Sequence, residues 1–446
     1  MCCPDLTRST RTRGLPALRV WNALCLTLLT LLLAACGGGS SSGSSGGGSS
    51  SSSGATIVGN SLPGANVMAV TVDCGPGTTP NQSCASYPNY YVNRLYANVT
   101  ICQPGTNNCQ TIDHVLVDTG STGLRLLASA VSGSLGLATG TLHACQQYVD
   151  GSYTWGPVVN ADVRLGNAGL MTASSLPIQL VQAQTNTGST TCPQGSGAAI
   201  TSTTSLGAKG ILGIGLFAED CGASCVGSAL AGFYYQCTGG ACTGTTLPRA
   251  SQIANPVSRF ATDNNGLAVV LPTVTGSTAT SLSGAVLFGI GTQSNNQPGS
   301  ARLLTTNGSG YITTTSALGT QTISFLDTGS NGLFFGQNNP PTVPPPFTTC
   351  ASQPWYCPAA PVVGSATLLG VSGGSAVASY TVSNATSMFS TFDPVLPSLA
   401  GWASASSNTM FDWGLPFFYG KTVFIGIEGK SSPISTGPSY PPYFAF

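Results

Sequence analysis

Residues 116–124 of this chain read LVDTGSTGL, and residues 325–333 read FLDTGSNGL. From the Asp to the closing Leu, six of seven residues are identical, and Asp118 and Asp327 are 209 positions apart. A carboxylate that recurs once in each half of a chain predicts two similar lobes that each contribute one Asp to a shared site. Two carboxyls in one site perform acid–base chemistry that neither performs alone, because two like charges at short range cannot both form cheaply.

Composition agrees with a two-domain chain of low charge. The chain has 446 residues, which is long enough for two domains. Only 6% of the residues are charged, compared with roughly 25% in an average soluble protein. Ser, Thr, Asn and Gln supply the polar surface instead. The formal net charge is zero, so no nucleic acid or anionic surface is expected as a partner.

The N-terminus predicts a lipoprotein signal peptide over residues 1–35. Arginines at positions 8, 11, 13 and 19 form a basic start, and an apolar run follows from Ala23 to Ala35. That run is too short for a membrane-spanning helix, which needs about 20 residues, and it suits a signal-peptide core. Residues 33–36 read LAAC and resemble the bacterial lipobox, in which cleavage precedes the Cys and the Cys carries the lipid. The lipidation site is then Cys36; an ordinary secretory signal with a chance Cys is the alternative.

Residues 36–54 are predicted to be the lipidated Cys followed by a flexible tether. Gly37 to Gly54 contains only Gly and Ser, and such a segment has a typical reach of roughly 25 Å. Gly37, in place of Asp, resembles lipoproteins that are sorted to the outer membrane. We therefore expect a bacterial cell-envelope protein that contacts the outer membrane through its N-terminal lipid, on the periplasmic or the surface face.

Cysteine spacing predicts six local disulfides. Beyond residue 35 and apart from Cys36, 12 Cys remain. Pairing neighbours gives Cys74/Cys84, Cys102/Cys109, Cys145/Cys192, Cys221/Cys225, Cys237/Cys242 and Cys350/Cys357, which fits an oxidising compartment. Spacing does not fix the connectivity, and Cys221/Cys225 could exchange partners with Cys237/Cys242. Metal binding is disfavoured because His114 and His143 are the only His residues, so we expect no metal and no cofactor.

Short β-branched runs separated by turn-rich segments predict a mostly β fold. The expected strands are Val67–Val72, Arg94–Cys102, His114–Val117, Ala161–Leu165, Ile178–Val181, Leu267–Leu271, Ala285–Phe288, Thr322–Leu326, Ala376–Val382 and Thr422–Ile427. Pro256–Thr262 is a weak helix candidate. Pro340–Pro346 is expected to be a rigid surface loop, with Cys350/Cys357 closing its far side.

The repeated motif and its flanks resemble the pepsin-type aspartic proteases. Lys209–Leu216 (KGILGIGL) resembles the apolar-apolar-Gly element of the first lobe, and Asp412–Phe418 (DWGLPFF) is a looser copy for the second. Gly284–Gly289 resembles the strand that ends the first lobe, and Leu95–Ile101 resembles the strand before the first motif. The resemblance covers about residues 90–430. With its lipoprotein N-terminus, the chain resembles a proteobacterial lipoprotein branch of unassigned function.

This resemblance implies a bilobal fold with the active-site cleft between two related β lobes. Residues 55–293 are expected to form the N-terminal lobe with the first motif, and residues 294–446 the C-terminal lobe with the second. Asp118 and Asp327 would share one proton and activate a water that attacks a peptide carbonyl.

The remaining motif residues are expected to support this pair of carboxyls. In the family, the hydroxyls of Thr119 and Thr328 bond across the lobe interface, and the following Ser residues bond the outer carboxylate oxygens. A glycine after each Thr allows close backbone approach. The residues in these last two roles are Ser121, Ser330, Gly120 and Gly329.

Three positions depart from the family pattern or leave alternatives open. The flap hairpin of the family carries a Tyr over the substrate; counting back from Gly156 puts Val149 at that position, and a one-residue bulge would restore Tyr148. Packing of Tyr148 on the sheet without a flap role is the alternative. Arg125 stands where an aromatic residue is usual, whereas the second motif has Phe334; Arg125 would either lower the carboxyl pKa values or face solvent. His143 is expected to be structural.

Together these features predict a membrane-anchored aspartic endopeptidase that is monomeric and acts on polypeptide substrates. A catalytically inactive lipoprotein of the same fold, acting as a binding or structural surface protein, is the alternative.

Overall fold

The computed structural model describes residues 55–56, 64–78, 83–184, 192, 197–338, 341–342, 347–351, 353–403, 409–435 and 441–446. The predicted signal peptide and tether, with Cys36, lie outside the described residues. So does most of the predicted Pro340–Pro346 loop, of which only Pro341–Thr342 is described, as a short strand. No helix in the described residues is long and apolar enough to cross a membrane.

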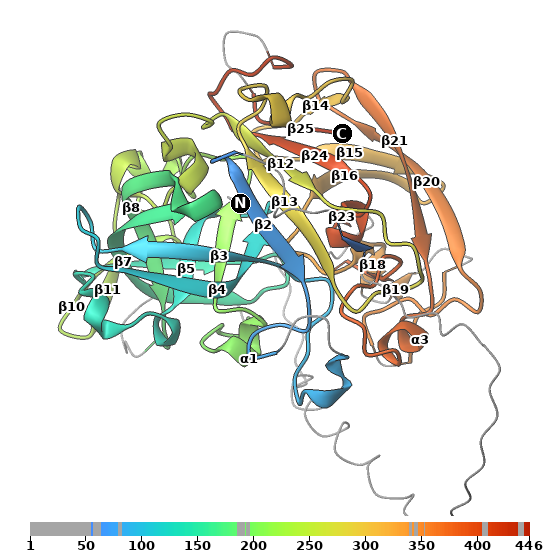
Figure 1. The fold of residues 1–446 in the computed structure, drawn as a ribbon, viewed down its shortest axis with the longest axis horizontal. Coiled ribbons are helices and arrows are strands. Elements are labelled where there is room, and N and C mark those ends of the chain that lie inside the picture. The colour runs from blue at the N-terminus through green and yellow to red at the C-terminus, as the bar shows by residue number, and fades with distance from the viewer. Residues whose placement is uncertain are drawn as a thin grey trace, which may run out of the picture. The chain divides into compact units, whose positions relative to one another are not determined.

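The described residues are mostly β and belong to one compact unit (Figure 1). Sixteen of the described strands form the larger sheet, with β1 (Ala55–Thr56) paired to β13. The order of the others is β11 (Ala241–Gly244), β10 (Tyr234–Thr238), β6 (Leu142–Gln147), β7 (Tyr153–Leu165), β8 (Met171–Val181), β5 (Thr122–Leu127), β9 (Gly210–Ile214), β4 (Cys109–Asp118), β3 (Leu95–Cys102), β2 (Val67–Val72), β13 (Leu282–Phe288), β12 (Gly266–Val270), β24 (Thr422–Gly426), β25 (Tyr443–Ala445) and β14 (Leu303–Thr305).

A second sheet is built only from strands of the C-terminal half. Its order is β21 (Ser375–Val382), β20 (Val362–Leu369), β15 (Ile312–Ser316), β16 (Gly319–Leu326), β23 (Met410–Trp413), β17 (Leu333–Phe335) and β22 (Ala400–Gly401). A small hairpin pairs β18 (Gln337–Asn338) with β19 (Pro341–Thr342). The α-helices are single turns: α1 (Thr203–Leu206), α2 (Ser224–Gly227) and α3 (Ala385–Phe389). The 3-10 helices are Cys84–Ser86, Ala128–Ala130, Gly133–Leu135, Asn167–Gly169, Arg249–Ser251, Pro256–Arg259, Ser294–Asn296 and Leu415–Phe417.

The same strand pattern surrounds both copies of the motif. In the first half, β4 leads to the motif and pairs in parallel with β9, β9 pairs antiparallel with β5, and β5 pairs in parallel with β8. In the second half, β16, β23, β17 and β22 repeat those three pairings in the same order and sense. This duplication is the bilobal, pepsin-like β architecture that the repeated motif predicts, so the predicted fold class is confirmed.

The two lobes share backbone hydrogen bonds. β12 from the first half pairs antiparallel with β24 from the second, over five residue pairs from Gly266↔Gly426 to Val270↔Thr422. Figure 1 shows these two strands side by side, between the blue-green strands of the first half and the orange strands of the second. The larger sheet therefore runs without interruption from one lobe into the other.

Most predicted strands lie within observed ones, and the misses have a physical reason. β5 was not predicted because all six of its residues are buried, so its sequence lacks the alternation of a half-buried strand. The helix expected over Pro256–Thr262 is wrong: Pro256–Arg259 is one 3-10 turn, capped by the Asn255 side chain. Its buried residues Pro256, Val257 and Ser258 are consecutive and do not form a helical stripe.

The predicted pairing of neighbouring cysteines is confirmed for all six disulfides. The bonds are Cys74–Cys84, Cys102–Cys109, Cys145–Cys192, Cys221–Cys225, Cys237–Cys242 and Cys350–Cys357. The exchange of partners that spacing left open does not occur.

Cys225 bonds to Cys221 because the turn before α2 brings the two close together. Cys225 lies in α2 and is fully buried, and its carbonyl accepts a hydrogen bond from the N–H of Leu247 at 2.8 Å. A turn of helix was not among the expected elements here. Cys221 precedes α2 in a turn that includes Gly222 at φ 61°, and its Cα lies 5.7 Å from that of Cys225, which suits a disulfide.

Cys357 closes a loop of its own that begins at Cys350, after the proline-rich stretch. Its N–H donates to the carbonyl of Thr348 at 2.7 Å, and Thr349 and Tyr356 form an antiparallel bridge. The Thr386 hydroxyl lies 3.3 Å from Sγ of Cys357 and connects this loop to α3. The predicted Cys350–Cys357 bond is thus present, whereas its relation to the Pro340–Pro346 loop lies outside the described residues.

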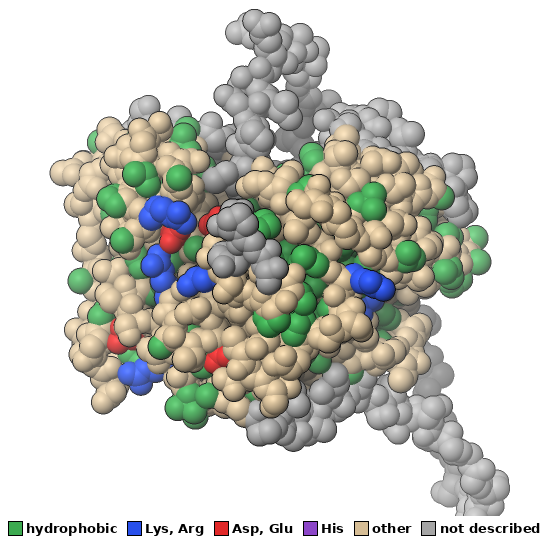
Figure 2. Space-filling model, turned by 90° about the horizontal axis from the view of Figure 1, so that it is seen from above, with side chains coloured by type: hydrophobic (Ala, Val, Ile, Leu, Met, Phe, Trp, Pro, Cys, Tyr) green, Lys and Arg blue, Asp and Glu red, His purple; other side chains and the backbone are tan. Residues whose placement is uncertain are grey.

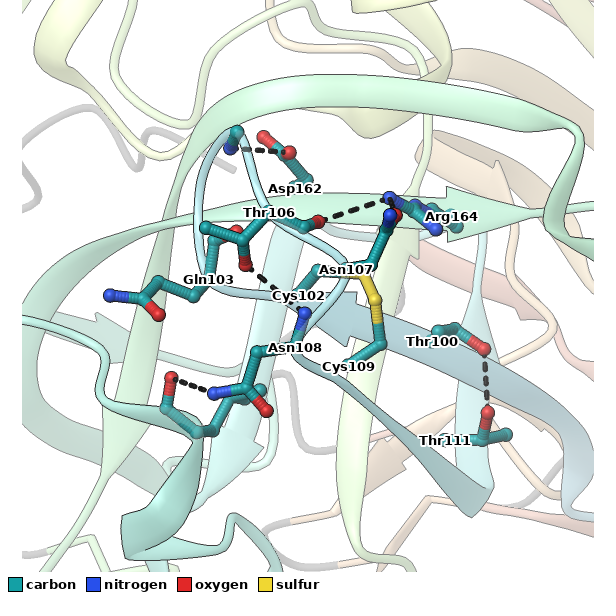
Figure 3. Close-up of a disulfide and its surroundings, with 12 residues drawn as sticks. Thr100, Cys102, Gln103, Thr106, Asn107, Asn108, Cys109, Thr111, Asp162 and Arg164 are labelled. Carbon is teal, nitrogen blue, oxygen red and sulfur yellow. Dashed lines mark hydrogen bonds between the residues drawn. A yellow bond between two sulfur atoms is a disulfide. The ribbon is translucent and has the colours of Figure 1, made fainter.

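Cys102 and Cys109 face each other where β3 and β4 form a hairpin (Figure 3). The turn between them is fixed by a backbone N–H of Gly105 that donates to Asp162 at 2.9 Å, and by Arg164, which donates to the Thr106 carbonyl at 3.3 Å. A short loop is thus closed both covalently and by polar contacts to β7.

The surface carries few charges. Figure 2 shows a face on which a few basic and acidic side chains lie among uncharged polar and hydrophobic ones. Several of the 26 charged residues are instead buried: Arg125, Asp118, Asp220, Asp327 and Asp412 are each less than 10% exposed. Some of the few charges of this protein therefore lie in its interior.

The disulfides are expected to stabilise the fold more where they close longer loops, with the logarithm of loop length. Cys145–Cys192 spans 47 positions, and Cys237–Cys242 spans 5. Loop-closure entropy predicts that replacing both cysteines of the first pair by Ser lowers the free energy of unfolding by about 4 kcal/mol, and of the second by about 2 kcal/mol. Urea unfolding of the two double variants measures this; an equal loss in both would contradict the entropic origin.

Candidate active site

The two motif aspartates lie at equivalent strand ends and face each other. Asp118 is the last residue of β4, and Asp327 follows β16 directly. A Cβ added at Gly120 would lie 2.6 Å from the carboxyl carbon of Asp327, and one at Gly329 would lie 2.6 Å from Oδ1 of Asp118. Each motif glycine therefore packs against the carboxyl of the other lobe. Only glycine fits here, because any side chain would collide with that carboxyl.

The two threonines of the motifs link the lobes reciprocally. The Thr119 hydroxyl donates to the carbonyl of Leu326 at 3.0 Å and accepts from the Thr328 N–H at 3.0 Å. The Thr328 hydroxyl donates to the carbonyl of Val117 at 2.7 Å and accepts from the Thr119 N–H at 3.1 Å. Both side chains are buried, at 2% and 0% exposure. These four bonds fix the strand ends that carry the two carboxyls.

Each carboxyl also has donors from its own motif. In the first lobe, the N–H of Gly120 donates to Oδ1 of Asp118 at 2.8 Å, and the Ser121 hydroxyl donates to Oδ2. Both carboxyl oxygens of Asp118 therefore accept a hydrogen bond from its own motif.

The second lobe repeats this pattern. The N–H of Gly329 donates to Oδ1 of Asp327 at 2.7 Å, and the Ser330 hydroxyl lies 2.9 Å from Oδ2. The structure thus brings together all eight motif residues that the sequence singled out.

The environment makes one carboxyl hold a proton. Asp118 and Asp327 are only 6% and 9% exposed. Burial raises the pKa of Asp327 well above its ordinary value, and the charges of Asp118 and Asp412 and a hydrogen bond to Asp118 raise it further. Two adjacent carboxyls hydrogen-bonded to each other share a proton, so the pair carries one acid and one base at the same time.

Tyr148 lies at the tip of the β6–β7 hairpin with its hydroxyl buried. Its N–H donates to the carbonyl of Ser152 at 2.8 Å, just beyond the last paired residues, Gln147 and Tyr153. The paired residues of this hairpin show no register shift, so the one-residue bulge considered for Tyr148 is absent from them. Val149, the alternative flap residue, is 53% exposed. Burial raises the pKa of Tyr148 to about 12; the charge of Arg125 opposes this and that of Asp118 adds to it. The Tyr148 hydroxyl therefore lies within electrostatic range of the first carboxyl.

Arg125 is buried beneath this hairpin and does not face solvent. It is 1% exposed, and its Nη2 lies 3.0 Å from Oδ2 of Asp220 and 3.0 Å from Oε1 of Gln146. Tyr234 donates to the other oxygen of Asp220 at 2.5 Å. The charge is therefore compensated locally by Asp220. At the equivalent position of the second motif, Phe334 packs against Trp355 with ring centroids 5.5 Å apart.

The histidines have structural contacts. His143 stacks on Trp155 with centroids 5.6 Å apart, which agrees with a structural role. His114 lies between Asp73 at 3.3 Å and Asp113 at 2.7 Å. Among the described residues, no group of three or more His, Cys, Asp or Glu is arranged to hold a metal ion.

Two of the disulfides lie behind side chains that flank the motifs. Cys225 packs in an apolar cluster with Tyr234, whose hydroxyl binds Asp220. Cys357 packs on a cluster that includes Trp355, the aromatic neighbour of Phe334. Both cysteines therefore support the walls around the two motif turns and contribute no reactive group, because their sulfurs are oxidised.

Asp412 is a site residue that the sequence did not single out. It is 2% exposed, and its Oδ2 lies 2.6 Å from the hydroxyl of Ser330. Burial raises its pKa to about 8; the hydrogen bond from Ser330 opposes this, and the charge of Asp118 adds to it. Its position in the sequence could have indicated it as a site residue, because Asp412 stands where an apolar-apolar-Gly element has its first apolar residue.

The Arg125–Asp220 pair is expected to stabilise the first lobe. Arg125→Met leaves the buried Asp220 charge uncompensated by Arg125, which costs roughly 3–5 kcal/mol in a buried pair. Arg125→Met/Asp220→Asn removes both charges and should recover a large part of that loss. Urea unfolding of the two variants measures the difference; a loss below about 1 kcal/mol in the single variant would show that the pair is not buried as a charged unit.

Comparisons with known proteins place the chain in a family. A search of curated proteins found no match. Among solved structures, aspartic proteinase from Irpex lacteus is similar with a TM-score of 0.46 and 15% identity, over 79% of this chain and 93% of that chain. Basic 7S globulin from soybean is similar with a TM-score of 0.37 and 11% identity, over 81% and 93%. A family model described as "Protein of unknown function (DUF3443)" matches residues 63–446. Because the match spans most of the sequence, the chain belongs to the DUF3443 family.

Proposed function

We propose that this protein is an aspartic endopeptidase that hydrolyses peptide bonds in polypeptide substrates, with Asp118 and Asp327 as the acid–base pair. The observation that carries the proposal is the mutual approach of the two motifs, in which each glycine backbone lies against the carboxyl of the opposite lobe. A duplicated strand pattern alone would not need that contact. Two hydrogen-bonded carboxyls at a lobe interface have the composition of an acid–base catalyst.

In the proposed reaction, the paired carboxyls exchange roles. The ionised carboxyl takes a proton from a water molecule as its oxygen attacks the peptide carbonyl carbon. The protonated carboxyl gives its proton to the carbonyl oxygen, and the resulting tetrahedral species breaks its C–N bond as the nitrogen is protonated. Asp327 is the group that holds the proton at the start, because burial and its neighbours raise its pKa. No covalent enzyme intermediate is required.

Tyr148 is proposed to cover the substrate as the residue of the flap. Its hydroxyl is buried within range of Asp118, and the hairpin that carries it ends in a tip at residues 148–152. Water exclusion around the carboxyls strengthens every electrostatic interaction within the site.

The location in the cell remains a proposal from the sequence. Residues 33–36 and the Gly/Ser segment support a lipid anchor on Cys36 and a tether to the outer membrane of a bacterial cell envelope. Six disulfides support an oxidising compartment. Palmitate labelling of wild type, lost in Cys36→Ser, is the measurement that decides the anchor.

Removal of either carboxyl is expected to abolish turnover. Asp118→Asn and Asp327→Asn should each lower kcat/KM on an unfolded protein substrate by roughly 10³-fold or more, because neither variant retains a base and an acid. Asp113→Asn is the matched control: it makes the same change on β4, at a side chain that is 49% exposed and paired with Lys209. Thermal unfolding should show that all three variants fold.

Binding of pepstatin, an inhibitor of aspartic proteases, distinguishes the proposed peptidase from an inactive binding or structural protein. We expect the wild type to bind pepstatin and Asp118→Asn to lose that binding. Cleavage by both Asn variants at the wild-type rate would refute the proposed pair. Absence of both cleavage and pepstatin binding in the wild type would favour the inactive binding or structural protein.

A further inference from the structure

The hydroxyl of Ser330 lies between two carboxyls. Its oxygen is 2.9 Å from Oδ2 of Asp327 and 2.6 Å from Oδ2 of Asp412. A serine hydroxyl has one hydrogen, so it donates to only one of these oxygens. The second short contact is a hydrogen bond only if the other carboxyl is protonated and donates to the serine oxygen. If both contacts are hydrogen bonds, at least one of the two carboxyls, Asp327 or Asp412, must be protonated.

The third carboxyl is present in one lobe only. On the parallel strands β16 and β23, Phe325 is the partner of Asp412, and on β4 and β9 the corresponding pair is Leu116 and Ile211. Asp412 therefore occupies the position that Ile211 occupies in the first lobe. There, within the described part of the chain, the Ser121 hydroxyl contacts the carboxyl of Asp118 alone.

The surroundings of Asp412 favour its neutral form at low and neutral pH. The facing residues on β16 and β17 are Phe325 and Phe334, which have no ionisable group. Its Oδ1 is buried without a hydrogen-bond partner among the described residues. The titratable groups that act on it come from the two motif turns, and burial raises its pKa to about 8.

One further charge lies at the second motif turn. Arg94 donates to the carbonyl oxygen of Gly329 at 3.5 Å, and so places a cation near the backbone of that turn. This cation is not among the groups that act on Asp412, which are Ser330 and Asp118.

We propose that Asp412 is a positioning residue for the proton shared by Asp118 and Asp327, which together form the dyad. Once ionised, Asp412 keeps a proton on Asp327 at pH values at which Asp118 and Asp327 alone would lose it. This inference rests on the proposed peptidase function. At low pH, Asp412 donates its proton to Ser330, and Ser330 donates to Asp327. As pH rises, Asp412 releases its proton to solvent first, because Asp118 and Asp327 are too close for both to ionise.

Ionisation of Asp412 then acts on Asp327 in two ways. The Ser330 hydrogen turns to the new carboxylate, so Asp327 loses a donor that favours its charged form. The negative charge of Asp412 adds to that of Asp118 and further disfavours loss of the Asp327 proton. Both effects have the same sign, so the one-proton state of the dyad persists to higher pH.

The test is the pH profile of variants at position 412. Asp412→Asn keeps a donor to Ser330 at every pH and carries no charge, and Asp412→Ile reproduces the first lobe. Both should move the alkaline limb of the pH profile of kcat/KM to lower pH by about one unit or more, measured on a peptide whose cleavage pepstatin inhibits. In a Ser330→Ala background, Asp412→Asn should give a smaller shift. An unchanged limb, or one that moves to higher pH, overturns the proposal.

A readout without turnover separates this inference from the peptidase proposal. Infrared titration of the full-length wild type from about pH 5 to about pH 10 should show a protonated-carboxyl band that persists at about pH 7. In Asp412→Asn, the component of this band that belongs to Asp412 should be absent. The remaining component should titrate at lower pH than in the wild type. If this is seen without cleavage by the wild type, the proton coupling stands and the peptidase proposal fails. If Asp412→Asn leaves the band unchanged, the coupling is wrong even where cleavage is observed.

Discussion

The reciprocal hydrogen bonds of Thr119 and Thr328 are the constraint on which the site depends. Each hydroxyl is buried and acts as both donor and acceptor across the lobe interface. Loss of one hydroxyl would leave a buried N–H and a buried carbonyl unpaired, each at a cost of about 1–3 kcal/mol. The ends of β4 and β16, which lie in different sheets, are therefore held together at the residue before each Asp. Because the carboxyls follow directly, they can meet only if these four bonds form.

The two halves share this framework but use their charges differently. The first lobe buries Arg125 with Asp220 beneath the β6–β7 hairpin. At the equivalent position of the second lobe, Phe334 packs on the aromatic ring of Trp355. The second lobe instead buries Asp412 next to the dyad. The duplication therefore preserves backbone topology, whereas the polar groups around each Asp are specific to one lobe. A two-fold related backbone thus supports a site whose two carboxyls are not equivalent.

The sequence predicted those features of the structure that can be recognised within short stretches of residues, and missed those that depend on residues far apart in the sequence. The repeated nonapeptide predicted both motif turns and the duplicated lobes, and neighbouring cysteines predicted the disulfides, because both signals are local in sequence. Tyr148 could not be distinguished from Val149, since the register of a hairpin tip depends on which side faces the core. Asp412 was passed over because a polar residue in an apolar element suggests degeneration until its partner, 82 positions away, is known.

A protein with so few charges gives each buried one unusual weight. With 6% of its residues charged, the field at the dyad is set by a few nearby groups and is not averaged over a charged surface. A third carboxyl on the far side of Ser330 therefore acts on Asp327 at short range. Screening by salt is also weak at side chains less than 10% exposed. The protonation of the dyad is then a property of the second lobe as a whole, and Asp412 belongs to the site on physical grounds although it lies outside the repeated motif.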